Sequence, residues 1–174
     1  MANTYTLISS VTVGSGGTSS IDFTSIPATY TDLCLNLSLR SDGALNYGTN
    51  IKLVFNGSTT AVYSSKRLEG YDSSAGSNQT SSLGYQDSSL ATNDAITANT
   101  FGSATIYIPN YAGSANKSSS ADYVVPKNAT TLWDIGLNAN LWANTSAITS
   151  IAITSSNGIW KQYSTAYLYG IKNS

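Results

Sequence analysis

The chain has 174 residues, a net charge near −1, no histidine and one cysteine. Charged residues make up 10% of it, against about 25% in a typical soluble domain, while Ser, Thr and Asn together make up about 38%. This composition excludes histidine-dependent catalysis, imidazole-ligated metals, an intrachain disulfide and a cysteine-clustered zinc site, and it offers no basic surface to nucleic acid.

The first third of the chain predicts short strands with one buried face. Residues 5–13 and 20–23 are rich in Thr, Ile, Val and Tyr, which favour strands. The Gly-rich residues 14–19 between them predict a turn, since they lack the lysine and the following helix of a phosphate-binding loop. Residues 33–39 carry a leucine at every second position, which is typical of a strand that buries one face.

A hairpin and a long loop are predicted next. Residues 51–55 alternate apolar and polar side chains and run into Asn56-Gly57, a strong signal for a two-residue hairpin turn, so residues 60–67 predict the return strand. Residues 70–93 are rich in Ser and Gly and predict a 24-residue loop. Two interpretations stay open: a solvated loop without a ligand, or a contact loop whose Tyr71 and Tyr85 meet a neighbouring subunit or a sugar.

The second half of the chain repeats the pattern of short strands. One helical turn is expected at 92–100 and another at 138–144. At the C-terminal end Tyr163, Thr165, Tyr167 and Tyr169 share one face of a strand, which predicts a stripe of tyrosines. The strands expected in this half are 105–108, 121–125, 131–137, 148–154 and 163–171.

These elements indicate an all-β protein. About eight to ten short strands, polar turns and no window with a long helical period favour a single antiparallel β-sandwich, jelly-roll-like, over residues 1–174. A parallel α/β fold would need crossover helices. No apolar run approaches the 18–20 residues of a membrane span, and residues 1–7 lack the pattern of a secretory signal, so we expect a protein made in a cytoplasm, away from membranes.

Catalytic and metal chemistry finds little support in the titratable residues. Glu69, Asp72, Asp87 and Asp94 lie in or beside the predicted loop and could supply a glycosidase acid pair or a calcium site, but they read equally well as solubilising loop charges. Cys34 alternates with leucines and has no base nearby, which is typical of an inert, partly buried thiol. We therefore assign no catalytic, cofactor or metal residue and predict that the protein is not an enzyme.

The aromatic residues are more informative. Twelve Tyr and three Trp outnumber three Phe, and Tyr and Trp suit interfaces and sugar platforms because they carry a polar tip on an apolar body. The three tryptophans, Trp133, Trp142 and Trp160, are expected near strand ends or in turns. The alternative is that these rings pack the sandwich core. The residues expected at an interface or against a glycan are Tyr71, Tyr85, Trp142, Trp160 and Tyr163.

Five segments in order resemble small virion structural proteins of tailed bacteriophages, frequent in marine and cyanobacterial phages. The resemblance spans nearly the whole chain apart from residues 70–93. It implies a β-sandwich on the particle surface, assembled in the host cytoplasm and without catalysis. The segments that carry it are 21–33, 55–57, 106–112, 147–151 and 167–171.

Three functions follow as hypotheses. The first is a capsid decoration or cement protein, a homotrimer or, as the next expectation, a dimer, that binds the major capsid protein and stabilises the assembled head. The second is a tail-fibre or receptor-binding module that recognises a host surface glycan. The third, a polysaccharide-degrading enzyme, would depend on Glu69 and Asp72. Self-association is expected because a chain with 17 charged residues can protect few sheet edges with charge.

Overall fold

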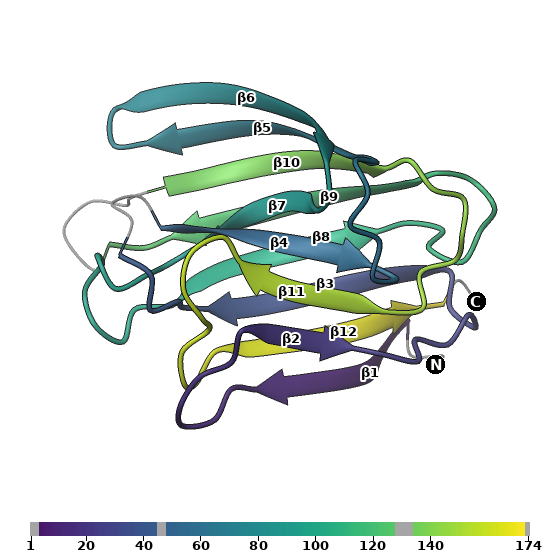
Figure 1. Cartoon of the computed structure of the whole chain (residues 1–174), viewed down its shortest axis with the longest axis horizontal. Helices are drawn as coiled ribbons and strands as arrows, with labels where there is room; N and C mark the ends of the chain where they lie inside the picture. The colour runs from purple at the N-terminus through teal and green to yellow at the C-terminus, as the bar shows by residue number, and fades with distance from the viewer. Residues whose placement is uncertain (1–3, 45–47, 128–133, 173–174) are drawn as a thin grey trace.

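The computed structural model describes residues 4–44, 48–127 and 134–172. Twelve strands in these ranges form an antiparallel sandwich of one eight-stranded and one four-stranded sheet (Figure 1). The all-β sandwich that the sequence predicts is confirmed. No helix in the described ranges is long and apolar enough to span a membrane.

The larger sheet has the strand order β1-β12-β3-β8-β9-β10-β5-β6, and the smaller one has the order β2-β11-β4-β7. Figure 1 shows β5 and β6 at the top of the view, beyond β7, the last strand of the smaller sheet. In sheet order, the bounds of the larger sheet are Tyr5–Thr12, Thr165–Ile171, Asp32–Leu39, Gly102–Ile108, Lys117–Val125, Asp134–Trp142, Tyr63–Tyr71 and Ser74–Leu83. Those of the smaller sheet are Ser20–Phe23, Ile151–Ser155, Thr49–Phe55 and Gln86–Ala91.

The core lies between the two sheets. Alternation along β3 turns its four leucines inward, as predicted, and each is at most 4% exposed. They join one buried cluster with the inward residues of β2, β4 and β11, which are rich in Ile, Leu and Phe. Burial of such side chains contributes about 1.5–3 kcal/mol each relative to leaving them in water. This cluster therefore fixes the positions of β2, β3, β4 and β11 relative to one another.

The predicted 24-residue loop at 70–93 is wrong. Residues 74–83 form β6, which pairs with β5 through a turn at Asp72 with a positive φ of 48°, and residues 86–91 form β7 in the other sheet. Ser- and Gly-rich composition hid these strands, because β6 sits at a sheet edge where little side-chain burial is needed. The two strands account for the larger number found than predicted.

The hairpin predicted at Asn56-Gly57 is only half right. The turn forms, with φ of 52° and 67°, but β4 pairs with β7 and β11, while the following β5 joins the larger sheet. The Asn56 side chain explains the change of sheet: its Oδ1 accepts the N–H groups of Thr149 and Ser150 at 2.8 and 3.1 Å. These bonds tie the turn to the segment leading into β11, so the chain leaves the sheet there.

Strand β10 reverses the usual alternation. Ile135 and Leu137 are 47% and 61% exposed, while Asp134, Asn138 and Asn140 on its other side are at most 5% exposed. The helical turn predicted at 138–144 is wrong, since residues 138–142 continue this strand. A strand is also predicted at 131–137, and its residues 131–133, which include Trp133, lie outside the described residues. An antiparallel strand ordinarily turns its apolar side chains to the core.

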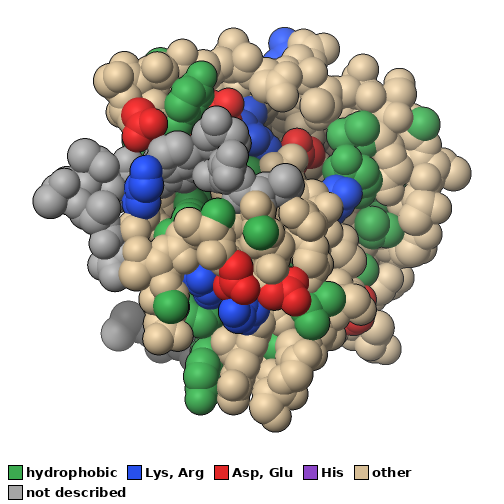
Figure 2. All heavy atoms as spheres, turned by 60° about the vertical axis from the view of Figure 1, so that its left-hand side comes forward, with side chains coloured by type: hydrophobic (Ala, Val, Ile, Leu, Met, Phe, Trp, Pro, Cys, Tyr) green, Lys and Arg blue, Asp and Glu red, His purple; other side chains and the backbone are tan. Residues whose placement is uncertain are grey.

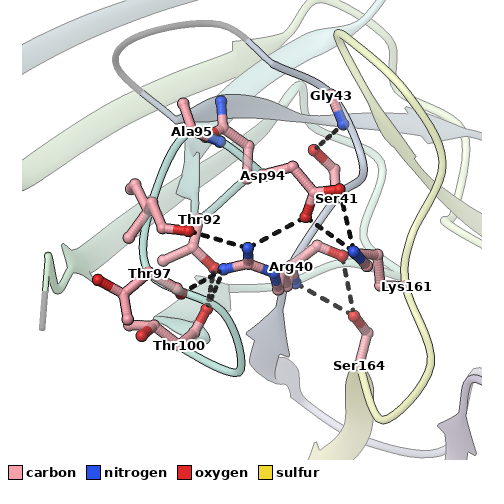
Figure 3. Close-up of polar contacts among 12 residues, drawn as sticks. Arg40, Ser41, Gly43, Thr92, Asp94, Ala95, Thr97, Thr100, Lys161 and Ser164 are labelled. Atoms are coloured by element: carbon pink, nitrogen blue, oxygen red, sulfur yellow. Dashed lines mark hydrogen bonds and ion pairs between the residues drawn. The ribbon is translucent and has the colours of Figure 1, made fainter.

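Residues 92–100 fold around Arg40 instead of forming a helical turn (Figure 3). Nη1 of Arg40 donates to the carbonyls of Thr97 and Thr100, and Nη2 donates to Asp94 and to the carbonyl of Ile96, all at 3.0 Å. The Asp94 carboxylate also binds Lys161 at 2.8 Å, and this hydrogen bond is the main reason that its pKa is lowered. The guanidinium thus organises a segment that has little apolar surface of its own.

Candidate functional site

The two tryptophans expected at an interface or against a glycan are buried. Trp142 is 1% exposed and stacks on Tyr63 at 6.2 Å between ring centroids, with Phe55 at 5.5 Å. Trp160 is fully buried and donates its indole N–H to the carbonyl of Ile153 at 2.9 Å. Their prediction as contact residues is wrong, because both rings fill the space between the sheets.

The three tyrosines of that prediction lie apart from one another. Tyr71 ends β5 and is 39% exposed; Tyr85 follows β6, at the other end of the same hairpin, with Nζ of Lys52 4.3 Å from its ring centroid. A nine-residue strand separates these two rings by roughly 25–30 Å. Tyr163 precedes β12, at a different position in the sheet, and is 67% exposed. The described residues therefore do not gather the predicted contacts into one site.

An apolar groove lies on the outer face of the larger sheet. We use this name for Leu68 of β5, Val124 of β9 and Ile135 and Leu137 of β10, which are 37–63% exposed. Leu68 lies directly opposite Leu137, and Ile135 directly opposite Val124, so the four side chains are cross-strand neighbours. Two adjoining hollows of about 610 and 490 Å³ share Leu68 and Leu137 in their walls.

Three glycines, Gly70, Gly76 and Gly136, line the 490 Å³ hollow. Gly70 faces the groove, where an added Cβ would meet Ile135 at 3.6 Å, whereas Gly76 and Gly136 face Glu69 and Tyr123 on the opposite side of the sheet. Among the strand residues around the groove, Lys66 and Asp122 are the charged, exposed side chains that turn outward. Charged side chains are also sparse in the view of Figure 2, where they form a few groups and most of the visible surface is neither charged nor hydrophobic.

A second apolar area on the outer face carries tyrosines. Tyr167 and Tyr169 of β12 point outward, as the predicted tyrosine stripe requires, and Tyr169 packs edge-to-face on Tyr5 at 6.3 Å between ring centroids. Tyr107 of β8 also faces outward and donates its hydroxyl to Asp32 at 2.6 Å. The outer face is thus rich in apolar and aromatic surface near both edges of the sheet.

Behind the groove, a polar cluster fills the opposite side of β5, β9 and β10. Arg67 pairs with Asp87 of β7 at 3.1 Å and with Glu69 at 3.4 Å. The hydroxyl of Tyr123 lies 3.4 Å from Glu69 and 3.3 Å from Asp134. Three carboxylates, one guanidinium and one phenol therefore share a nearly dry space between the sheets.

Burial governs the protonation of this cluster. It raises the pKa of Asp134 to about 6, with a further contribution from the negative charge of Glu69. It also raises the pKa of Asp87, which Arg67 pulls back down, and the pKa of Tyr123. Asp134 therefore holds its proton up to about pH 6, and it is 5% exposed with its carboxylate against the Tyr123 hydroxyl.

The structure brings together two of the four acids considered from the sequence: Glu69 and Asp87 both bind Arg67 in this cluster. Asp72 is exposed at the β5–β6 turn and Asp94 binds Arg40, so neither of them joins the cluster. No group of three or more carboxylate, thiol or imidazole side chains is placed to hold a metal ion within residues 4–44, 48–127 and 134–172. Cys34 is buried, and burial raises the pKa of its thiol, which makes it a poor nucleophile.

A small polar cavity adjoins the cluster between β5, β6, β7 and β10. Its volume is about 10 Å³, close to the minimum for one water molecule. Four atoms of its lining residues have no hydrogen-bond partner: Ser65 Oγ, Arg67 Nε, Thr80 Oγ1 and Asn138 Oδ1. Ser65 and Asn138 are 6% and 3% exposed, so these polar groups are buried, although the exposed Asn78 also lines the cavity.

Sequence reasoning missed both the groove and the polar cluster. A signal was present in residues 134–142, where polar Asp and Asn alternate with Ile and Leu in one continuous strand pattern. That pattern does not say which set faces inward, and the usual rule would bury the apolar set. Only the packing of β10 against β5, β9 and β7 shows that the apolar set faces out.

Comparison with known proteins shows no family for this chain. No family model matches the chain, and no curated protein matches it. Among solved structures, the crystal structure of Scytalido-glutamic peptidase with a peptide-based transition state analog aligns at 9% identity and a TM-score of 0.19. The alignment covers 78% of this chain and 63% of the peptidase chain, and a similarity that low supports no statement about fold or activity.

Proposed function

We propose that this chain is a structural protein of a tailed-phage particle, a capsid decoration protein that docks onto the assembled head through the apolar groove. The observation that carries the proposal is the reversed alternation of β10, which places Ile135 and Leu137 in solvent and Asn138 in the interior. A lone soluble domain gains nothing from that arrangement, whereas a subunit that is covered after assembly does.

The free energy gained by covering the groove is large enough for docking. Covering a leucine that is more than half exposed recovers about 1–2 kcal/mol, so the groove as a whole supplies several kcal/mol without any ion pair. Such a contact depends weakly on salt, because Lys66 and Asp122 are the exposed charges around it. The resemblance of the sequence to small phage virion proteins supplies the partner, the major capsid protein, and the location, the particle surface after assembly in the host cytoplasm.

The mechanism is mass action. A protein that binds the assembled shell and not its free subunits shifts the equilibrium toward the shell by an amount set by its concentration and affinity. No covalent step is required. Particles lacking this protein are therefore expected to lose heat or pressure tolerance and to regain it when the purified protein is added back.

The test adds purified variants to particles that lack the protein. The double variant Leu68→Ser/Leu137→Ser removes the centre of the groove, and Leu7→Ser removes a leucine that is 51% exposed near the other edge of the same face. We expect wild type and Leu7→Ser to cosediment with particles and restore tolerance, and the double variant to do neither while unfolding at an unchanged urea concentration. Full binding by the double variant, or binding to tails or host cells alone, would contradict the proposal.

A further inference from the structure

The open edge of the larger sheet at β6 is a candidate interaction surface. β6 is the longest strand of the described residues, with ten residues, and its backbone pairs with β5 alone among them. Seven of its side chains are exposed. An extended edge of this kind presents a row of free N–H and C=O groups that can pair with another strand.

Charge and proline, two usual protections of an edge, are missing from β6, and its one irregularity, at Ser82 with a φ of 57°, lies near its C-terminal end. Its sequence, SAGSNQTSSL, has no charge and no proline. The pairing with β5 is regular over residues 74–80, with the shift in register confined to the end near Ser65. The other edges are less suited: β2 has four residues and carries Asp22, β7 is buried throughout, and β1 is interrupted by a register shift between Leu7 and Ser9.

We propose that β6 pairs with β6 of a second copy of this chain, antiparallel and about a two-fold axis perpendicular to the sheet. A two-fold pair opposes each residue to a residue of the same strand, so an uncharged strand meets no like charge when it pairs with itself. The nearest exposed charge that faces outward, Lys66 on β5, would lie about 14 Å from its copy, beyond the screening length of about 8 Å at physiological salt. Pairing of β6 with its own copy therefore brings no like charges close together.

The pairing has a geometric consequence that deepens the docking function and rests on it. A two-fold axis perpendicular to a sheet keeps the same face of both copies on the same side. Both apolar grooves would then face one surface, separated by the two β5–β6 hairpins, and a dimer could attach at two points. Two-point attachment raises apparent affinity without new contacts to the partner.

The experiment measures the mass of the purified chain in solution by light scattering after size exclusion, at 5–200 µM. We expect twice the chain mass of 18.2 kDa. The variant Ser77→Lys/Gln79→Lys places like charges on both copies of β6 and is expected to weaken dimerisation at least tenfold. The matched control Ser15→Lys/Ser19→Lys adds the same charge in the 14–19 turn and is expected to remain dimeric.

Hydrogen exchange provides a second measurement, which does not depend on a variant. Backbone amides of residues 74–80 that point away from β5 are expected to become protected as protein concentration rises, while those of β1 are unchanged. A monomer at 200 µM, a dimer unaffected by the β6 lysines, or a three-chain species protected at β1 as well as β6 would each overturn the two-fold pairing. These readouts use no phage particle, so they fail or succeed independently of the docking function.

Discussion

Gly136 lies directly beneath the ring of Tyr123. A Cβ atom at Gly136 would approach the Tyr123 hydroxyl oxygen to 2.4 Å, closer than any real contact. The absence of a side chain on β10 lets the phenol cross from β9 toward Glu69 on β5 while it also reaches Asp134. One glycine thus allows three strands to share a single buried hydroxyl.

Gly136→Ala is expected to destabilise the protein by about 1–3 kcal/mol, because the buried ring must move and surrender its contacts with Glu69 and Asp134. Gly70→Ala, on the neighbouring strand, is the matched control: its Cβ would meet Ile135 at an ordinary 3.6 Å, and no loss is expected. Urea unfolding of both variants measures the difference. Equal stability of the two would show that the ring is free to shift.

Asp134 makes the fold less stable as the pH rises. Its pKa is about 6 in the folded protein, against an ordinary value of 3.8. Since the folded state binds this proton more tightly than the unfolded chain, the free energy of unfolding falls between those two pH values, by at most about 3 kcal/mol. Asp134→Asn keeps an acceptor for Tyr123 and is expected to remove this fall, leaving the smaller slope due to Asp87.

Urea titrations at pH 4.5 and 7.5 measure the effect, and Asp94→Asn provides a control of opposite sign. The pKa of Asp94 is lowered, mainly by its hydrogen bond with Lys161, so its contribution is present at pH 7.5 and lost as the pH falls through the folded pKa. We expect Asp94→Asn to lose stability at both pH values, since both lie above the ordinary pKa of 3.8, whereas Asp134→Asn gains stability at pH 7.5. A parallel response of the two variants would contradict the assignment.

Arg40→Met is expected to destabilise the protein by about 3–5 kcal/mol. The guanidinium is 4% exposed, and its removal leaves the carbonyls of Ile96 and Thr97 without the donor it supplies, while Asp94 keeps Lys161 and the Thr100 carbonyl keeps the Thr92 hydroxyl. Arg40→Lys replaces the planar guanidinium with a single ammonium group, so its free energy of unfolding is expected to lie between those of wild type and Arg40→Met. Lys66→Met, at an exposed position, controls for the loss of one positive charge and is expected to change stability by less than about 0.5 kcal/mol.

The polar cavity between β5, β6, β7 and β10 is expected to hold one ordered water molecule. Such a water can accept from Arg67 Nε, donate to Asn138 Oδ1 and bond the hydroxyls of Ser65 and Thr80, which satisfies all four groups. A high-resolution crystal structure measures its presence directly. Thr80→Val is expected to cost about 1 kcal/mol through the lost bond to that water, and a stabilising effect would indicate a dry cavity.

The sequence by itself determined the class of the fold and much of its core. The leucines of 33–39, the absence of any helical period and the turn residues at Asn56-Gly57 each act over a few neighbouring residues, so local patterns suffice to predict them. The strands at 74–83 and 86–91 could not be predicted in the same way. Their residues have weak strand propensity: β6 pairs with the adjacent β5 across a short turn that its Ser- and Gly-rich composition does not reveal, and β7 pairs with β4, which lies about 30 residues away in the chain.

Only the tertiary structure decided which face of β10 meets water. A strand pattern of period two defines two faces and leaves open which of them is inside. Asn138 faces inward because its Nδ2 reaches the carbonyl of Asp87 at 3.0 Å, in a cluster that Arg67 also joins, and this turns Leu137 outward onto the groove. That choice depends on contacts between β5, β7 and β10, which are far apart in sequence, and it creates the surface on which the proposed function depends.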